Sequence, residues 1–294
     1  MKASAQQGLL LSLCLLAGCS ESRRPHPEQF HYPIGVYIQS TPNDFWLAVE
    51  TGLRKRLHLP GVTLTVRYFR QNERERVARV LREGDWRAVA LCAPPDEWTN
   101  QTIQQVMGNG IPLLCLATDA PDSVRAGFVG TYYYDAGRKV GAWYARRVPQ
   151  GVIVVMTGHP VPRAASEFWE GFRHGLLFNR RVCAQLISLS DSRQAWNAFQ
   201  QVQGNPAVQG IFLMGAEVAA QVLQALEGKP RPARLGMFSW RKEAEQWFLH
   251  GHCDLLIQEQ PEAIGERLGN LLRDHSAGRG KPQNVFIPYL WRAR

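Results

Sequence analysis

The sequence predicts an α/β protein of two doubly wound lobes, each a parallel sheet with helices on both faces. Three observations predict this fold class. Short apolar runs alternate with amphipathic helical stretches from residue 34 onward, the alternation starts again after Gly130, and no flexible Gly/Ser linker separates the two series. The chain has 294 residues, of which 45% are hydrophobic and 20% charged, so its composition is that of an ordinary globular protein long enough for two domains.

The first series opens with an apolar strand at 34–38. After a loop, residues Phe45, Val49, Leu53 and Leu57 recur at helical spacing and predict the first helix. The same rhythm then continues through strand 63–69, helix 73–82, strand 88–92, helix 100–107 and strand 111–116.

The second series follows Gly130 and repeats the alternation. Its predicted elements are helix 135–147, strand 152–156, helix 164–178, strand 182–189, helix 192–203, strand 210–214, helix 218–226, strand 235–238 and helix 243–249. Two such lobes leave a cleft between the carboxyl ends of their strands, where ligands of parallel sheets bind.

The amino terminus predicts an export signal at 1–18. Lys2 precedes an apolar run at 8–18 that is too short to span a bilayer. Ala17 and Gly18 directly before Cys19 resemble the lipobox of bacterial lipoproteins, whose cysteine is acylated. This resemblance implies that Cys19 is the lipidation site and that residues 19–32 form a tether to a membrane, in the periplasm or at the cell surface. Ordinary secretion, with Cys19 in a disulfide, is the alternative.

The net charge bears on the possible binding partners, and the cysteine content bears on disulfide formation. A net charge of +9 in a cytoplasmic protein would favour nucleic acid binding, but export excludes that partner, so we interpret the charge as a solvated surface near anionic lipid.

Four further cysteines, Cys92, Cys115, Cys183 and Cys253, lie in a compartment that permits disulfides. A bridge between Cys92 and Cys115, on strands expected to be neighbours, and buried thiols both remain open.

An ordered set of motifs resembles a known family. The motifs are Phe-Val-Gly-Thr at 128–131, Asp-Ala-Gly-Arg-Lys at 135–139, Glu-Gly-Phe at 170–172, Gln-Pro-Glu-Ala-Ile-Gly at 260–265 and a terminal strand, Asn-Val-Phe-Ile-Pro, at 284–288. In this order they resemble the type I periplasmic sugar-binding proteins, the ribose-binding group that shares its core with LacI-type repressors. The likeness covers roughly 33–290. The repressors carry a DNA-reading helix-turn-helix before this core, where this chain has an export signal and a tether.

The resemblance implies how the lobes are assembled and what they do. The chain would cross between lobes near 131–132, 258–259 and 288–289, giving a first lobe of 33–130 plus 260–286 and a second of 131–259 plus 287–294. The implied function is a monomeric solute-binding lipoprotein that closes on a small molecule and delivers it to an ABC-type permease in the membrane. The alternative is an accessory binding protein that signals to a sensor histidine kinase.

The resemblance also implies where aromatic rings meet the ligand. Residues 43–46 match the family's Asn-Pro-Phe-Phe/Trp loop, which makes Phe45 and Trp46 candidate stacking faces and Asn43 a candidate polar contact. Aromatic rings commonly line ligand pockets. In the alternative, one of these rings only packs in the core of the first helix.

Most of the family's sugar-binding polar positions differ in this chain. The usual Asp aligns with Ala117, beside Thr118 and Asp119, the usual Arg with Phe168, the usual Asn-Asp pair with residues 215–216, the next Asp with Ser239, and the crossover Gln with Glu259. Several charged hydrogen bonds of about 1.5–3 kcal/mol each would thus be lost.

We therefore expect a ligand that is less hydroxylated and more apolar or aromatic than a hexose. The candidate lining residues are aromatic: Trp240, Phe168, Trp169 and the tyrosine run Tyr132, Tyr133 and Tyr134. The helical spacing of Phe168 with Phe172 and Leu176 is equally typical of a core stripe. No Gly-x-Ser-x-Gly, His-Glu-x-x-His or phosphate-loop motif occurs. The His-Gly-His-Cys run at 250–253 contains possible metal ligands, but a surface turn after the preceding helix explains it more simply. We therefore expect no catalytic residue, no metal and no cofactor.

Overall fold

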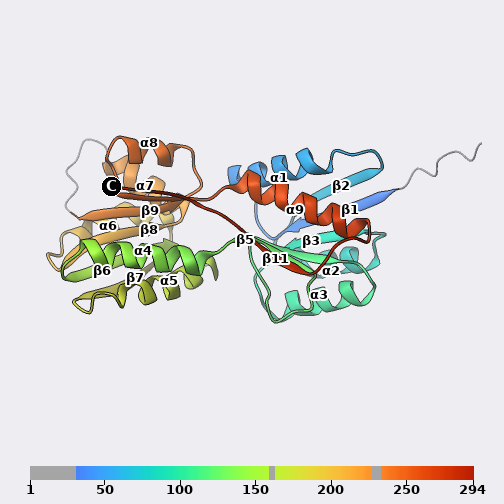
Figure 1. The fold of residues 1–294 in the computed structure, drawn as a ribbon, viewed down its shortest axis with the longest axis horizontal. Helices are drawn as coiled ribbons and strands as arrows, with labels where there is room; N and C mark the ends of the chain where they lie inside the picture. The colour runs from blue at the N-terminus through green and yellow to red at the C-terminus, as the bar shows by residue number, and fades with distance from the viewer. Residues whose placement is uncertain (1–30, 159–162, 227–232) are drawn as a thin grey trace, which may run out of the picture. The chain divides into compact units, whose positions relative to one another are not determined.

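The computed structural model of the chain describes residues 31–158, 163–226 and 233–294. The predicted signal at 1–18, Cys19 and nearly all of the tether lie outside the described residues. The described chain forms two six-stranded sheets with flanking helices (Figure 1). Within these ranges, none of the helices combines the length and the apolar character that crossing a bilayer requires.

The first sheet is parallel throughout and has the strand order β11-β5-β4-β3-β1-β2. Its strands are β1 (Tyr32–Ile38), β2 (Val62–Tyr68), β3 (Ala88–Cys92), β4 (Leu113–Leu116), β5 (Gly127–Thr131) and β11 (Gln283–Ile287). Its helices are α1 (Asp44–Leu57), α2 (Arg74–Glu83, after a 3-10 turn at Gln71–Glu73), α3 (Glu97–Gly108) and α9 (Pro261–Ser276). The core on one face is built with α1 and α9 and that on the other with α2 and α3.

The second sheet has the order β12-β10-β9-β8-β6-β7 and is parallel except for β12, which runs antiparallel to β10. Its strands are β6 (Gly151–Gly158), β7 (Val182–Leu189), β8 (Val208–Met214), β9 (Arg234–Ser239), β10 (Leu255–Gln258) and β12 (Leu290–Ala293). Helices α4 (Tyr133–Arg147) and α5 (Arg163–Leu176) pack on one face. The other face carries α6 (Ala195–Gln203, after a 3-10 turn at Ser192–Gln194), α7 (Ala216–Leu226) and α8 (Glu243–Leu249).

The chain passes between the two sheets at three places. It leaves the first sheet from β5 into α4, returns from β10 into α9, and leaves again from β11 into β12. We refer to these connections as the first, second and third crossovers. The predicted fold class, two doubly wound lobes joined by three crossovers, is therefore confirmed. The short strands β5, β10 and β12 were not named as strands in the sequence analysis.

Glycines bring α4 and α5 into backbone contact. A Cβ atom on Gly137 of α4 would overlap the carbonyl oxygen of Phe168, and one on Gly171 of α5 would overlap that of Tyr134. Gly141 and Gly175 make the same close approach one turn further along. The two helices can pack at this distance only because these four positions have no side chain.

The described cysteines form no disulfide. Cys92, Cys115 and Cys253 are buried and Cys183 is exposed. Strands β3 and β4 are neighbours as expected, but Cys92 packs in the core on the α1/α9 face and Cys115 in that on the α2/α3 face. Burial raises the pKa of both thiols to about 12. The alternative of buried thiols therefore holds for this pair.

Candidate functional site

The buried carboxylate of Glu259 joins the first two crossovers. Its Oε1 accepts a hydrogen bond of 2.9 Å from the hydroxyl of Thr131 and one of 2.6 Å from that of Tyr133. Glu259 follows β10, whereas Thr131 ends β5 and Tyr133 begins α4. Each of these side chains is less than 9% exposed. One carboxylate thus holds together two segments that are far apart in the sequence.

Burial dominates the electrostatics of this cluster. Loss of solvent raises the pKa of Glu259, and the hydrogen bonds from Tyr133 and Thr131 oppose that shift only in part. Burial and the adjacent carboxylate likewise keep the pKa of Tyr133 well above its usual value, so that its hydroxyl stays protonated and donates. The cluster therefore serves as an internal hydrogen-bonding unit.

Two more hydrogen bonds connect the third crossover to the first two. The side-chain amide of Gln260 donates to the carbonyl oxygen of Pro288 at 2.6 Å, and the hydroxyl of Tyr289 donates to Asp135 at 2.9 Å. Gln260 belongs to the second crossover and Asp135 lies on α4, directly after the first. All three crossovers are consequently connected by side chains.

A pair of aromatic rings connects the two lobes. The ring of Phe45, in the first turn of α1, lies 5.9 Å from the ring of Trp240, which follows β9. Phe45 is only 8% exposed, partly because Trp240 packs against the core in which it lies. Both rings were expected at a ligand, and the structure brings them together at the carboxyl end of the second sheet.

The other two predicted site residues near the start of α1, Asn43 and Trp46, make contacts within the protein. Asn43 caps α1, since its Oδ1 accepts a hydrogen bond from the backbone N–H of Trp46 at 3.1 Å. Trp46 is 8% exposed and packs in the core with its ring edge-on to Phe45 at 5.0 Å. In this arrangement the core covers most of the Trp46 ring, to the same extent as that of Phe45, so the role of Trp46 as a stacking face stays a prediction.

Phe168 and Ser239 also require correction. Phe168 is 0% exposed and stacks on Phe212 at 4.9 Å, on the face of the second sheet that α5 covers. The core alternative, indicated by its helical spacing with Phe172 and Leu176, is thus the right one. Ser239 is 0% exposed as well, and its hydroxyl accepts a hydrogen bond from the backbone N–H of Arg241. Neither side chain lines any of the three cavities described below.

Thr118, Asp119 and Tyr132 gather at one cavity of about 330 Å3. Its wall on the second lobe comes from the first two turns of α5, including Arg163 and Glu167, and from Tyr133 and Tyr134 at the start of α4. The carboxylate of Asp119 forms a bidentate pair with Arg125, in which Nε lies 2.5 Å from Oδ1 and Nη2 lies 2.7 Å from Oδ2. Glu167 pairs with Arg163 at 2.7 Å. Both acids are therefore neutralised by arginines of the protein itself.

Trp240 lines a second cavity, of about 700 Å3. Arg241, Lys242 and Glu243 follow it along the wall, and the amino-terminal turns of α1 and α9 complete the lining with Asp44, Ala48, Gln260, Pro261, Glu262, Ala263 and Glu266. These flanking residues were not among those predicted from the sequence. Gln260 and Pro261 lie inside one of the family motifs and beside a predicted crossover, and this position could have indicated that they line a cavity.

The cavities place rings beside charged groups, several of which are paired within the protein. In the second cavity a ligand would meet the Trp240 ring, whereas Glu262 and Glu266 are both paired with Lys55. A paired carboxylate is less able to replace the hydrogen bonds that a sugar hydroxyl gives up on leaving water. Among the described residues, no three His, Cys, Asp or Glu side chains gather where they could hold a metal ion. The arrangement supports binding of a small molecule.

Comparison with known proteins identifies the family. The family profile described as "Periplasmic binding protein domain" matches residues 34–280. The ribose import binding protein RbsB of Bacillus subtilis is 21% identical, with 98% of each chain aligned.

Solved structures share the fold. The glucose-galactose binding protein GanP of Geobacillus stearothermophilus superposes with a TM-score of 0.77 at 20% identity, covering 90% of this chain and 97% of GanP. A chain of the XylFII-LytSN complex superposes with a TM-score of 0.77 at 16% identity, covering 90% of this chain and 98% of that one. The resemblance seen in the sequence motifs is confirmed. The chain therefore belongs to the periplasmic binding protein family and has the two-lobe fold of its type I sugar-binding members.

Proposed function

We propose that this protein is an extracytoplasmic solute-binding lipoprotein that closes on a small molecule and delivers it to an ATP-driven permease. The observation that supports this proposal most is the family match over 34–280 on a fold with three crossovers. In such a protein, the solute stabilises a closed arrangement by contacting both lobes, and the permease recognises that arrangement.

The ligand we propose is less hydroxylated than a hexose and carries an apolar or aromatic face. RbsB and GanP are named for ribose, glucose and galactose, but this chain has lost most of the polar side chains that the family uses. Glu259 is engaged by Thr131 and Tyr133, and Asp119 by Arg125. Trp240 and Phe45, which come from different lobes, are the proposed contacts for the apolar face.

A thermal-shift screen of the mature protein tests this ligand class. We expect ribose, galactose and glucose at 1 mM to leave the melting temperature unchanged, and at least one small aromatic or sparsely hydroxylated metabolite to raise it. A ligand present at about 100 times its Kd stabilises the folded state by about 2.7 kcal/mol, which corresponds to about 5–10 °C for a chain of this size.

The controls for this screen are variants of Trp240. Trp240→Ala should weaken the identified ligand about tenfold or more, whereas Trp240→Phe, which keeps a ring, should retain most of the affinity. A large shift with any of the three sugars at micromolar concentration would contradict the proposed ligand class.

The anchor is tested by fractionation. We expect the protein to sediment with membranes and its mature amino terminus to be an acylated Cys19, because a chain with two or more acyl groups binds a bilayer stably. The Cys19→Ser variant should lose the acyl mass and should not be processed at Gly18. A wild-type protein that is recovered unacylated in the soluble fraction would rule out the lipoprotein assignment.

A second candidate is an accessory subunit of a membrane sensor kinase. The internal pairing of Glu259 and Asp119 favours it, since these two carboxylates are not free to bind a solute. This candidate predicts association with a kinase ectodomain without any added solute, whereas uptake predicts that a permease prefers the solute-bound form.

A further inference from the structure

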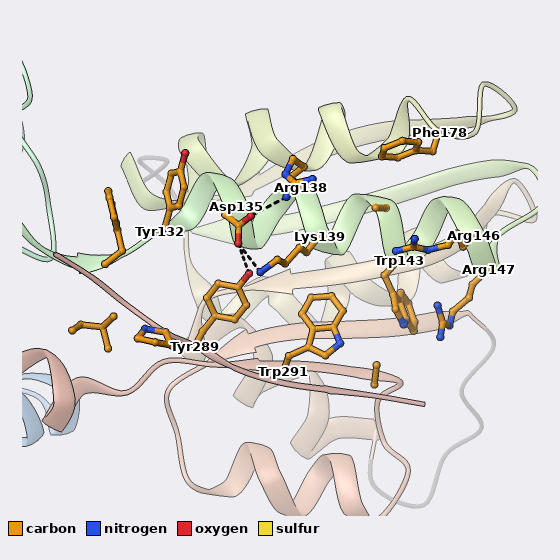
Figure 2. Close-up of a pocket in the computed structure, with 15 residues that line it drawn as sticks. Tyr132, Asp135, Arg138, Lys139, Trp143, Arg146, Arg147, Phe178, Tyr289 and Trp291 are labelled. Atoms are coloured by element: carbon orange, nitrogen blue, oxygen red, sulfur yellow. Dashed lines mark hydrogen bonds and ion pairs between the residues drawn. The ribbon is translucent and has the colours of Figure 1, made fainter. Parts of the chain in front are cut away.

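A further cavity of the described chain lies away from the Phe45–Trp240 contact. It has a volume of about 1040 Å3 and runs between α4 and β12; Figure 2 shows the side chains that line it. One wall is a stripe of α4 that includes Arg138, Trp143 and Arg146. The opposite wall is Tyr289, Trp291 and Ala293. We call this cavity the α4–β12 groove.

The alternation of side chains along β12 explains the groove. Because successive residues of a strand point to opposite faces, Tyr289, Trp291 and Ala293 face α4. Arg292 faces the other side, where it pairs with Glu245 of α8 at 2.7 Å. Strand β12 is the edge of its sheet, so its α4-facing side chains lie beyond the core that α4 and α5 cover.

The groove is cationic. Four basic side chains line it, Arg138, Lys139, Arg146 and Arg147, against the single carboxylate of Asp135. That carboxylate is already paired with Lys139 at 2.8 Å and with Arg138 at 3.1 Å. No carboxylate among the described residues pairs with Arg146 or Arg147, and the guanidinium of Arg147 instead lies 4.6 Å from the ring centre of Trp143.

Exposed aromatic residues surround these charges. Trp291 is 37% exposed, Tyr132 45%, Phe286 47% and Phe178 76%, and all four line the groove. Apolar rings that remain exposed together in a concave surface mark an interaction site more often than scattered ones do. Rings with unpaired guanidinium groups suit a ligand that is both apolar and acidic.

The backbone of β12 offers a further means of binding. The N–H of Arg294 donates to the carbonyl oxygen of Asp254, on the β10 side. Since donors alternate along an antiparallel strand, the N–H groups of Ala293 and Trp291 point away from β10, to the outer edge. Soluble proteins usually protect such an edge with charge or proline, yet β12 exposes Leu290 (42%) and Trp291 here.

We propose that the α4–β12 groove binds an extended acidic segment of a partner protein, which adds to β12 as an outer strand. Its carboxylates pair with Arg146 and Arg147, and its alternate apolar side chains pack on Trp291 and Phe178. Strand addition to an exposed edge is an established mode of peptide recognition. A flat membrane surface fits the observations less well, because a bilayer cannot enter a concave groove between a helix and a strand.

The test is a selection of random twelve-residue peptides displayed on phage, against the intact mature protein in detergent micelles. The comparison proteins are the groove variant Arg146→Ala/Arg147→Ala, the edge variant Trp291→Ala and the control Arg76→Ala/Arg79→Ala. The control removes the same charge from exposed positions of α2 in the other lobe. Enriched peptides are synthesised, and their affinity is measured by fluorescence anisotropy at 50 and 300 mM salt.

We expect the enriched peptides to alternate acidic with apolar residues and to lose about tenfold or more in affinity with the groove variant, with Trp291→Ala and at the higher salt. The control variant should bind as the wild type does. Hydrogen exchange should show slower exchange at 290–294 when the peptide is bound. Melting curves of the unliganded variants exclude unfolding as the cause.

Three results would overturn the proposal. They are no enrichment on the wild type over the groove variant, protection that maps outside α4 and β12, and binding of dihexanoyl phosphatidylglycerol through Arg146 and Arg147 in place of any peptide. The solute screen is independent of these outcomes, because Arg146, Arg147 and Trp291 line neither of the cavities described for the candidate site.

Discussion

Replacing Gly171 with alanine is expected to lower the free energy of unfolding by about 3 kcal/mol, and the melting temperature by about 6–12 °C. The added Cβ would overlap the backbone carbonyl oxygen of Tyr134 in α4. A backbone atom cannot rotate away as a side chain can, so α4 and α5 must separate and the core beneath them, including Phe168 and Phe172, must repack. Urea or thermal unfolding of the purified variant measures the loss.

Gly108 supplies the matched control. It ends α3, and a Cβ there would have nothing within 4 Å. Gly108→Ala should leave stability unchanged or raise it by up to about 1 kcal/mol, since alanine loses less backbone entropy on folding. Equal losses for the two variants would refute close packing of α4 and α5 as the cause.

The second large effect is expected at Glu259. Glu259→Ala removes the acceptor of two buried hydroxyl groups, Thr131 and Tyr133, and should lower the free energy of unfolding by about 2 kcal/mol. Glu259→Gln retains an oxygen at the same position and removes the cost of a buried charge. Its melting temperature at pH 7 should therefore be equal to or higher than that of the wild type.

The pH dependence of the free energy of unfolding, compared between the wild type and Glu259→Gln, isolates the effect of ionising the Glu259 carboxylate. Because burial raises the pKa of Glu259 in the folded state above its ordinary value of 4.5, the folded protein holds this proton more tightly than the unfolded chain does. Relative to Glu259→Gln, the wild type should be most stable below pH 4.5 and should lose that advantage as the pH rises through the folded-state pKa. A relative stability that rises with pH would show that hydrogen bonding outweighs burial.

The fold was largely predictable because each lobe repeats a pattern that local sequence carries. Apolar strands and amphipathic helices of ordinary length have a readable period. The strands that were not named are short: β5 has five residues, two of them glycine, while β10 and β12 have four each. Strand β12 also includes Arg292, and it forms only because β10 provides its partner. No local pattern indicates such a pairing.

The site was predicted less well, for a physical reason. Phe168 and Trp46 are aromatic residues at positions where the family uses ligand contacts, yet sequence cannot tell which side of a helix faces a core and which a cavity. Alignment identified Glu259 as a substitution but not its role, since Thr131 and Tyr133 reach it only after the crossovers meet. The glycine spacing at 137/141 and 171/175 was a readable sign of close helix packing.

The third crossover bears on the order in which the protein can form. The first sheet takes its edge strand β11 and the helix α9 from near the end of the chain, after the whole second sheet except β12 has been made. Folding from the amino terminus during synthesis is the usual course for separate domains, but here the first lobe is complete only after residues 261–287 have been made. A first lobe that is completed so late keeps the chain from reaching its final fold early, which would suit the proposed passage through a narrow export channel before folding.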